Sequence, residues 1–334
     1  MLARRNISAL LIALATLAAL LVPTAPAQAA TPPYVALGDS YSSGTGTGSY
    51  INDGTSCQRS VYAYPSLLAS QKGYALNFRA CSGATITDVT NTQLSALNTG
   101  TRYVTISVGG NDAGFADVLT ECATPWWAGD CDGAIDGAQA FINNTLPGRL
   151  NTLYSSIRSM APSARVVVVG YPRIFNGEDC NAATWFSPEE EARLNGTADL
   201  LNSKLSSAAS ARGFGFANPT GAFIGHAVCD SPEWINGLSW PISESYHPKV
   251  AGHSSGYAPT VSPLLTGAPA RITSRTYADV RANADALAAQ QRQYADMDAT
   301  IRPQTVRAPD LTTPAARRAA REHGINLKRW LARH

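Results

Sequence analysis

The chain has 334 residues, of which 45% are apolar, and it carries 26 Lys and Arg against 24 Asp and Glu. This composition excludes a chain that is disordered throughout, since disorder requires low hydrophobicity and a high net charge. A net charge of +2 also excludes a protein whose main task is to bind a polyanion. The length suits one large domain or two of ordinary size.

Charge is distributed unevenly along the chain. Residues 268–334 hold 12 Lys and Arg against 6 Asp and Glu, whereas residues 30–267 hold 12 against 18. An acidic body followed by a basic tail indicates two segments with different roles. We therefore divide the chain into a leader at 1–29, a body at 30–267 and a C-terminal extension at 268–334.

The leader has the pattern of a secretory signal peptide. Arg4 and Arg5 precede an apolar run over Ile7–Val22, and Ala27-Gln28-Ala29 supplies the small residues of a cleavage site. The alternative, a membrane anchor, is disfavoured because the run is short for a span of about 20 residues. We expect cleavage near Ala29 and a secreted protein.

Three short apolar runs in the body predict buried parallel strands. They are Tyr34–Leu37, Tyr103–Val108 and Arg165–Val169, and each is followed by glycine. Helices are predicted between them, with leucines at helical spacing over 145–160 and a helix start at Ser187-Pro188. This alternation predicts an α/β domain with a parallel sheet.

Polar residues follow two of these strands. Ser40 lies in Gly38-Asp39-Ser40, and Asn111 lies in Gly109-Gly110-Asn111-Asp112. Ligands of open parallel sheets bind at the carboxyl ends of the strands, so we expect both side chains in one crevice. A serine there can act as a nucleophile and an amide can donate to an oxyanion. Gly83 offers a further N–H donor, and His247 can act as the base.

Together and in this order, the motifs at Ser40, Gly83, Asn111 and His247 resemble the four sequence blocks of the SGNH, or GDSL, hydrolases. The resemblance runs from about Tyr34 to Gly267. The residues that flank the blocks are similar to those of the secreted actinomycete lipases and phospholipases A1 of that family.

The resemblance implies a flavodoxin-like three-layer α/β/α sandwich. It also implies that Ser40 is the nucleophile and His247 the base. The oxyanion hole would consist of the N–H groups of Ser40 and Gly83 and the side chain of Asn111.

The sequence departs from the family pattern next to the histidine. Many members have Asp three residues before the His, and here that position is Glu244. Some secreted lipases of this type are thought to orient the imidazole through a backbone carbonyl, which here would be that of Ser245. We expect a Ser40–His247 dyad oriented by Ser245, with Glu244 as the alternative.

Six cysteines lie in the body, at Cys57, Cys81, Cys122, Cys131, Cys180 and Cys229. In an exported chain an even number predicts disulfides, here three. Six cysteines allow 15 pairings. The shortest loops would pair them in sequence order, as Cys57–Cys81, Cys122–Cys131 and Cys180–Cys229, and the actinomycete subgroup is similar in this respect.

Two other motifs offer competing functions. Gly252–Gly256 matches the G-x-S-x-G elbow of α/β-hydrolases, but that elbow needs a preceding strand, which residues 246–249 do not predict. Gly44, Gly46 and Gly48 lack the spacing of a nucleotide-binding loop. We therefore expect neither a second nucleophile nor a nucleotide site.

Two segments could touch lipid. Trp126-Trp127 is either a packed loop or a lipid-touching tip. The extension predicts an amphipathic helix over Ser274–Ile301, a proline-containing linker, and a basic last helix that is either solvated or attracted to anionic lipid.

From the sequence we expect a secreted serine ester hydrolase, a carboxylic ester hydrolase acting on lipids as a lipase or phospholipase A1. An esterase of carbohydrate or other small acetyl groups is the alternative, because the same site chemistry permits it. A lipid- or wall-binding module without activity is the non-enzymatic alternative. No metal or cofactor and no nucleic acid is implied, and a monomer is expected.

Overall fold

In the computed structural model, which describes residues 31–333, five parallel strands form one sheet in the order β2-β1-β3-β4-β5. The strands are β1 (Pro33–Gly38), β2 (Ala75–Phe78), β3 (Tyr103–Ser107), β4 (Arg165–Val169) and β5 (Gly215–Ala217). This is the flavodoxin-like order of a doubly wound sheet, and its switch point lies between β1 and β3. The predicted α/β fold with a parallel sheet is confirmed.

The three predicted strands are the central ones, and the two edge strands are additional. β1, β3 and β4 are buried along nearly their whole length. β2 is half-exposed and β5 has three residues, one of them glycine. Neither edge strand carries the continuous apolar run that marked the central three.

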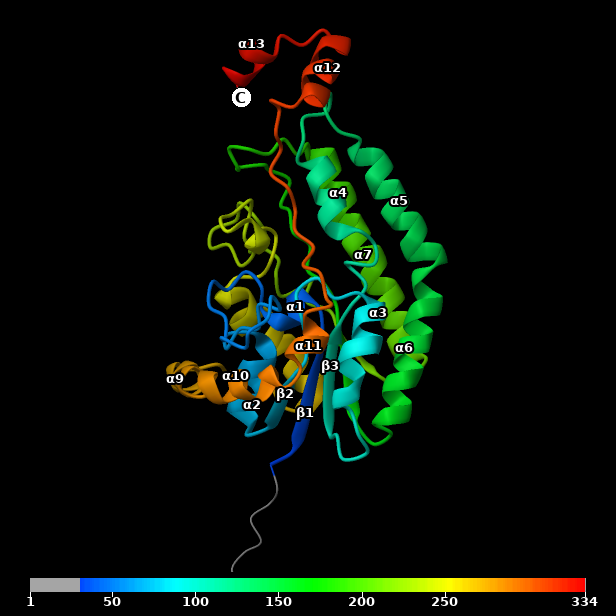
Figure 1. Ribbon diagram of the computed structural model, residues 1–334, viewed down its shortest axis with the longest axis vertical. Helices are drawn as coiled ribbons and strands as arrows, with labels where there is room; N and C mark the ends of the chain where they lie inside the picture. Colours follow the sequence, from blue (N-terminus) through cyan, green and yellow to red (C-terminus); the bar gives the residue numbers. More distant parts are fainter. Residues whose placement is uncertain (1–30, 334) are drawn as a thin grey trace, which may run out of the picture. The chain divides into compact units, whose positions relative to one another are not determined.

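Helices cover both faces of the sheet (Figure 1). On one face lie α2 (Tyr64–Lys72) and α8 (Ala258–Thr266), which pack against β2, β4 and β5. On the other face α6 (Leu146–Met160) and α7 (Pro188–Ser210) pack together, and α7 contacts β4 and β5. α4 (Phe115–Cys122) and α5 (Cys131–Asn144) pack beside α7.

Two of these helices match the sequence patterns closely. α6 buries Leu146, Leu150 and Leu153, whose spacing in the sequence places them on one face of a helix. α7 begins with a capping box, in which Ser187 and Glu190 satisfy each other's backbone N–H groups, and Pro188 occupies the first helical position. The short elements are α1 (Ser40–Ser43), α3 (Ile86–Asp88) and the single turns Val89–Gln93, Leu94–Ala96, Ile242–Glu244 and Gly252–Tyr257.

The extension forms several short helices instead of the one predicted over Ser274–Ile301, and that prediction is wrong. Its helices are α9 (Ser274–Ala282), α10 (Ala284–Arg292), α11 (Ala295–Asp298), α12 (Pro314–Glu322) and α13 (Leu327–Leu331). The first break falls at Asn283, which leaves helical geometry while its N–H caps α9. The breaks let Val280 and Ala288 pack beside α2 while Ile301 joins the main core.

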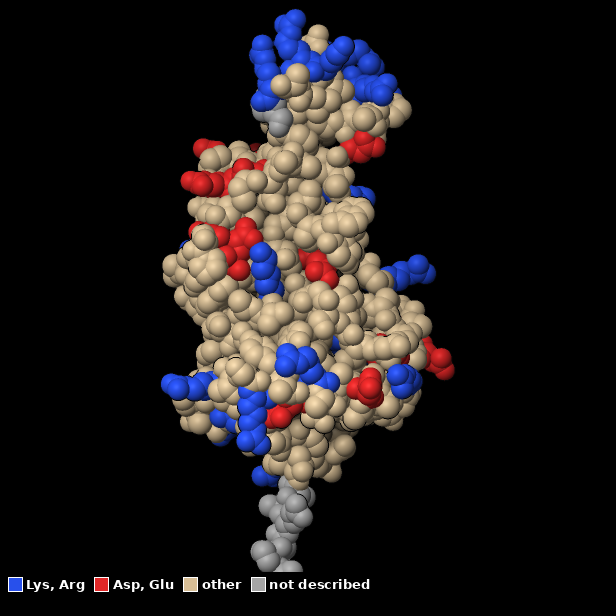
Figure 2. Space-filling model, turned by 90° about the vertical axis from the view of Figure 1, so that its left-hand side faces the viewer, with Lys and Arg blue, Asp and Glu red and all other residues tan. Residues whose placement is uncertain are grey.

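A buried ion-pair network joins the extension to the body. The carboxylate of Asp298 accepts from Arg59 Nη2 at 2.6 Å and from Arg79 Nη2 at 2.8 Å. Arg59 also pairs with Asp53 at 2.6 Å, and the side chains of all four residues are almost completely buried. Of the described residues, 32–333 form one compact unit. Six of the twelve Lys and Arg residues of the extension lie between Pro314 and Arg333, in and around α12 and α13, and basic side chains gather at the upper end of Figure 2.

The six cysteines form the three disulfides that the sequence order predicted, Cys57–Cys81, Cys122–Cys131 and Cys180–Cys229. In residues 31–333, no helix has both the length and the apolar character needed to cross a membrane. The predicted signal peptide at 1–29 lies outside the described residues.

Candidate functional site

Ser40 occupies the turn between β1 and α1, at the carboxyl edge of the sheet. It is the first residue of α1, and the preceding Asp39 caps the helix by accepting from the Tyr41 N–H at 3.0 Å. Gly38 makes the turn possible: its φ is +121°, and a Cβ there would lie 2.3 Å from the Ser107 carbonyl oxygen. As the first helical residue, Ser40 has no intrahelical acceptor for its N–H, which is therefore free for a ligand.

His247 lies against Ser40 and is held by its own loop. His247 Nε2 is 2.8 Å from Ser40 Oγ, and Nδ1 is 2.9 Å from the carbonyl oxygen of Ser245. Because a carbonyl only accepts, Nδ1 carries the proton, and Nε2 is left as the acceptor for the serine hydroxyl. The imidazole of His247 thus connects Ser40 to the carbonyl of Ser245 through two hydrogen bonds, and all three residues are candidates from the sequence.

The backbone around His247 is fixed by a left-handed residue and by Asn236. Tyr246 has a φ of +60°. Its N–H donates to the Asn236 carbonyl at 3.0 Å, and the Asn236 N–H donates to the His247 carbonyl at 2.9 Å. Gly46 closes over this loop, since a Cβ there would lie 2.8 Å from the His247 Cβ. Close packing against the histidine therefore explains the glycine at position 46.

Glu244 is occupied by another partner. Its Oε1 accepts from the Tyr50 hydroxyl at 2.6 Å, and that hydroxyl in turn accepts from the Gly46 N–H at 3.1 Å. No hydrogen bond joins the Glu244 carboxylate to the imidazole in the described part of the chain. The acid holds the glycine loop in place.

Burial controls the protonation of His247. Removal from water lowers the pKa of the imidazole to about 4, although the hydrogen bond to the Ser245 carbonyl acts in the opposite direction. The ring is therefore neutral near pH 7, which is the state in which Nε2 accepts a proton. The other ring nitrogen, Nδ1, faces the carbonyl dipole of Ser245 and not a charged carboxylate.

Gly83 and Asn111 approach the same edge of the sheet from the next two connections. The Cys81 N–H donates to the Gly38 carbonyl at 2.9 Å, which ties the Gly83 turn to the end of β1. The Gly83 N–H has no protein acceptor within residues 31–333. Asn111 Nδ2 donates to the Ala84 carbonyl at 3.0 Å, so one of its two amide hydrogens remains free.

An acidic network below Ser40 was missed by the sequence reasoning. The buried Asp39 carboxylate accepts from Ser107 Oγ at 2.6 Å and from the Tyr171 hydroxyl at 2.5 Å. Desolvation raises the pKa of Asp39 to about 6, and these hydrogen bonds oppose the rise. Tyr171 follows the third predicted strand directly, so its position at a carboxyl strand end was an available signal.

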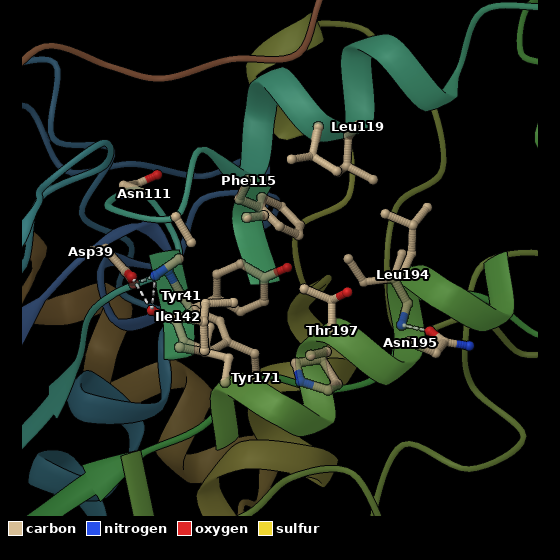
Figure 3. A pocket seen from close by; sticks show the side chains of 18 of the residues that line it. Asp39, Tyr41, Asn111, Phe115, Leu119, Ile142, Tyr171, Leu194, Asn195 and Thr197 are labelled. Carbon is tan, nitrogen blue, oxygen red and sulfur yellow. Dashed lines mark hydrogen bonds between the residues drawn. The ribbon is translucent and has the colours of Figure 1, made fainter. Parts of the chain in front are cut away.

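A largely apolar cavity opens beside Ser40. It measures about 750 Å³, counting the part open to solvent, and is bounded by α4, α5 and α7. Ser40 and Asn111 are among its lining residues, and in Figure 3 the side chains of Phe115, Leu119 and Leu194 converge on the space. Apart from Asp39, Ser40 and Asn111, the lining is mostly aliphatic and aromatic, and Asn195 and Thr197 add a few polar atoms.

The competing motif at Gly252–Gly256 does not form a nucleophile elbow. These residues form a buried helical turn with no strand before them, and the Ser254 hydroxyl donates to the Ala251 carbonyl. His253 is buried, and burial lowers its pKa to about 3. Within residues 31–333, no group of three or more His, Cys, Asp or Glu side chains is placed to hold a metal ion.

The extension passes directly over the Gly83 turn. A Cβ on Gly83 would lie 2.3 Å from the Arg302 carbonyl oxygen and 2.8 Å from the Pro303 Cα. The segment continues along α4, where the Arg307 N–H donates to Thr120 Oγ1 at 3.0 Å. The sequence predicted a linker here, since its proline residues indicate an extended backbone, but they do not indicate the surface on which that backbone lies.

The chain matches known proteins over most of its length. Residues 36–254 match the model of the GDSL-like Lipase/Acylhydrolase family. Lipase 1 of Streptomyces coelicolor is 44% identical over 251 residues, which cover 73% of this chain and 92% of that relative.

Two solved structures are also similar. The phospholipase A1 of Streptomyces albidoflavus is 45% identical with a TM-score of 0.66, over 70% of this chain and 99% of that one. The extracellular lipase of Streptomyces rimosus is 43% identical with the same TM-score, over 70% of this chain and 100% of that one. About three-tenths of this chain therefore has no counterpart in either structure.

The sequence blocks, the parallel sheet and these matches agree with one another, and the chain belongs to the GDSL-like Lipase/Acylhydrolase family and is a carboxylic ester hydrolase.

Proposed function

We propose that this protein is a secreted serine hydrolase that releases fatty acids from lipid esters, as a lipase or a phospholipase A1. The observation that carries the proposal is the pair of hydrogen bonds at His247, 2.8 Å to Ser40 Oγ and 2.9 Å to the Ser245 carbonyl. This geometry supports a catalytic dyad in which a backbone carbonyl takes the place of the acid of a triad.

In the proposed reaction Ser40 Oγ attacks the ester carbonyl while His247 Nε2 takes the hydroxyl proton. The lowered pKa of His247, about 4, keeps the base neutral and able to accept at neutral pH. The imidazolium that forms is stabilised by the Ser245 carbonyl dipole, and it then protonates the leaving alcohol. Water activated by the same ring hydrolyses the acyl-enzyme and releases the fatty acid.

In the proposed mechanism three donors stabilise the oxyanion. They are the Ser40 N–H at the start of α1, the Gly83 N–H and the free hydrogen of the Asn111 amide. Asn111 is held by its bond to the Ala84 carbonyl, so the amide is oriented before substrate binds. Preorganised donors of this kind stabilise the transition state more than the neutral ester.

The lining of the cavity favours a lipid ester over a small polar ester as the substrate. It begins at Ser40, and its aliphatic and aromatic lining between α4, α5 and α7 suits an acyl chain. Burying methylene groups there contributes about 0.8 kcal/mol each, so affinity should rise with chain length until the cavity is filled. An acetyl group would leave most of this surface uncovered.

A chain-length series tests this proposal. We expect the wild-type protein to prefer long-chain p-nitrophenyl esters and phosphatidylcholine over p-nitrophenyl acetate. Ala198→Phe, which fills the cavity from α7, should reduce kcat/KM for long chains at least tenfold and spare the acetate. Ala192→Phe, on the exposed side of the same helix, is the control and should change neither.

Two results of this series would contradict the proposal. A preference for acetyl esters, including acetylated sugars, would favour the acetyl-esterase alternative. A lack of turnover on every ester, with the fold intact, would favour a binding module. Neither result would alter the family assignment.

The proposed location is extracellular, with the leader removed near Ala29. Three disulfides in one body support an oxidising compartment, and the Streptomyces rimosus relative is described as extracellular. N-terminal sequencing of the protein from culture medium should begin at Ala30 or within one residue of it. A monomer is expected in solution.

A further inference from the structure

The last two helices present a basic surface. Between Pro314 and Arg333 the chain has six Lys and Arg residues against one acid, Glu322, and we call this segment the basic cap. All six basic side chains are exposed: Arg317, Arg318, Arg321, Lys328, Arg329 and Arg333. None of them forms an ion pair with a carboxylate elsewhere in residues 31–333. Figure 2 shows these positive charges together at one end, above a mixed surface.

The opposite side of the basic cap is fixed to the body by apolar contacts. Ala316 and Ala320 of α12 are buried with Leu311 and Trp127. The Trp330 ring of α13 packs edge-on against Trp127, with ring centroids 5.5 Å apart. Because this face is held, the charged face of α12 points away from the body.

An exposed aromatic ring lies beside these charges. Trp127 is 2% exposed, whereas the neighbouring Trp126 is 68% exposed, and its ring stands edge-on to His323 of the basic cap at 5.3 Å. Leu331 of α13 is also 47% exposed. Trp127 therefore fits the interpretation of this pair as a packed loop, whereas Trp126 is at the surface, where it could touch lipid. Basic residues combined with exposed Trp and Leu are typical of surfaces that lie on membranes.

The loop that carries Trp126 is connected to the cavity. It joins α4 to α5 and is closed at its base by the Cys122–Cys131 disulfide. The same two helices contribute Leu119 and Ile142 to the cavity wall beside Ser40. A surface bound at this loop would therefore lie at the end of the two helices that enclose the acyl site.

We propose that the basic cap, together with Trp126, docks the protein on an anionic phospholipid surface and so brings the acyl cavity to its substrate. Bringing the acyl cavity to its substrate rests on the proposed lipid hydrolysis, whereas docking on the surface does not. Charge complementarity favours an anionic partner, and the exposed Trp126 and Leu331 favour a lipid interface over a nucleic acid or another soluble polyanion.

Vesicle binding tests the docking without catalysis. The Ser40→Ala protein, which cannot consume the vesicles, is sedimented with vesicles of phosphatidylcholine alone or with 30% phosphatidylglycerol. We expect strong binding to the anionic vesicles, weakened by salt. The triple change R317Q/R318Q/R321Q should lower the partition coefficient by about fivefold per charge removed, on the order of 10² in total.

A control removes the same charge elsewhere in the extension. The triple change R271Q/R275Q/R281Q affects exposed arginines at or near α9, away from the basic cap, and should change binding less than threefold. Trp126→Ser should reduce binding to anionic vesicles, with thermal stability unchanged. In an otherwise wild-type chain, R317Q/R318Q/R321Q should retain full kcat on soluble p-nitrophenyl butyrate while losing activity on anionic vesicles.

Three results would overturn the docking proposal. They are equal binding to both vesicle types, equal loss of binding in both triple variants, and binding to DNA or heparin without binding to anionic vesicles. Loss of activity on every soluble ester in the wild-type chain would instead contradict the proposed hydrolysis, and it would leave vesicle binding as an independent result.

Discussion

Asp298 provides the most direct test of how the extension is joined to the hydrolase body. Its carboxylate accepts from Arg59 Nη2 at 2.6 Å and from both terminal nitrogens of Arg79 at 3.0 and 2.8 Å. With Asp53, the four side chains form a buried group of two positive and two negative charges. Asp298→Asn keeps the size and shape of the side chain but leaves one positive charge without compensation.

The expected cost follows from burial. Removing one partner from a buried ion pair destabilises a protein by about 3–5 kcal/mol, because the remaining charge stays out of water. In a protein of this size about 1 kcal/mol corresponds to roughly 2–3 °C in Tm, so we expect a decrease of about 6–15 °C. Arg59 also donates to the Ala80 carbonyl, so the loop leading to Gly83 should loosen before the rest of the body.

Calorimetry at one fixed scan rate measures this effect, since unfolding of a disulfide-bonded protein need not be reversible. Asp296→Asn is the matched control: it lies two residues earlier in α11, is exposed, and should change Tm by less than about 2 °C. If Asp298→Asn were as stable as the control, the extension would contribute nothing to the core, and the buried network would not hold it.

Three further predictions concern the site. Glu244→Gln should lower kcat less than tenfold, because the Glu244 carboxylate accepts a hydrogen bond from Tyr50 and the Ser245 carbonyl orients the imidazole. A loss of kcat near the 10⁴ typical of a triad aspartate, with the fold intact, would make Glu244 the third catalytic residue. Asn111→Ala should reduce kcat by about 10²–10³ with little change in KM, and an unchanged kcat in stopped-flow assays would remove Asn111 from the oxyanion hole. Because the pKa of His247 is lowered to about 4, the base is active above that pH and lost below it, so kcat/KM should stay level from pH 7 to about pH 5 and fall through pH 4; a midpoint at pH 6–7 would show that the imidazole is solvated.

Part of the site followed from the sequence because two of its residues lie at strand ends. Ser40 and Asn111 come directly after strong β-branched or apolar runs, and the carboxyl ends of parallel strands meet at one edge. The histidine loop was found through its resemblance to a family block. Its orientation by Ser245 depends on the positive φ of Tyr246, a backbone feature that residue types do not reveal.

The extension was predicted less well, and for a physical reason. Apolar periodicity over Ser274–Ile301 reports which residues become buried, but it does not report where a helix turns. The breaks beside Asn283 and Tyr294 bring Asp298 to two arginines more than 200 residues earlier in the chain. The residues around Asp298 in the sequence do not indicate Arg59 and Arg79 as its partners, because ion pairs between such distant residues form only once the chain has folded.

Active-site labelling tests whether Ser40 is the nucleophile and His247 its base. The wild-type protein is treated with a long-chain fluorophosphonate at pH 7, digested, and mapped by mass spectrometry. We expect one adduct per chain, on the peptide that contains Ser40, with labelling at least 10³-fold slower in His247→Ala. An adduct on another serine such as Ser254, or full ester hydrolysis by Ser40→Ala, would contradict it.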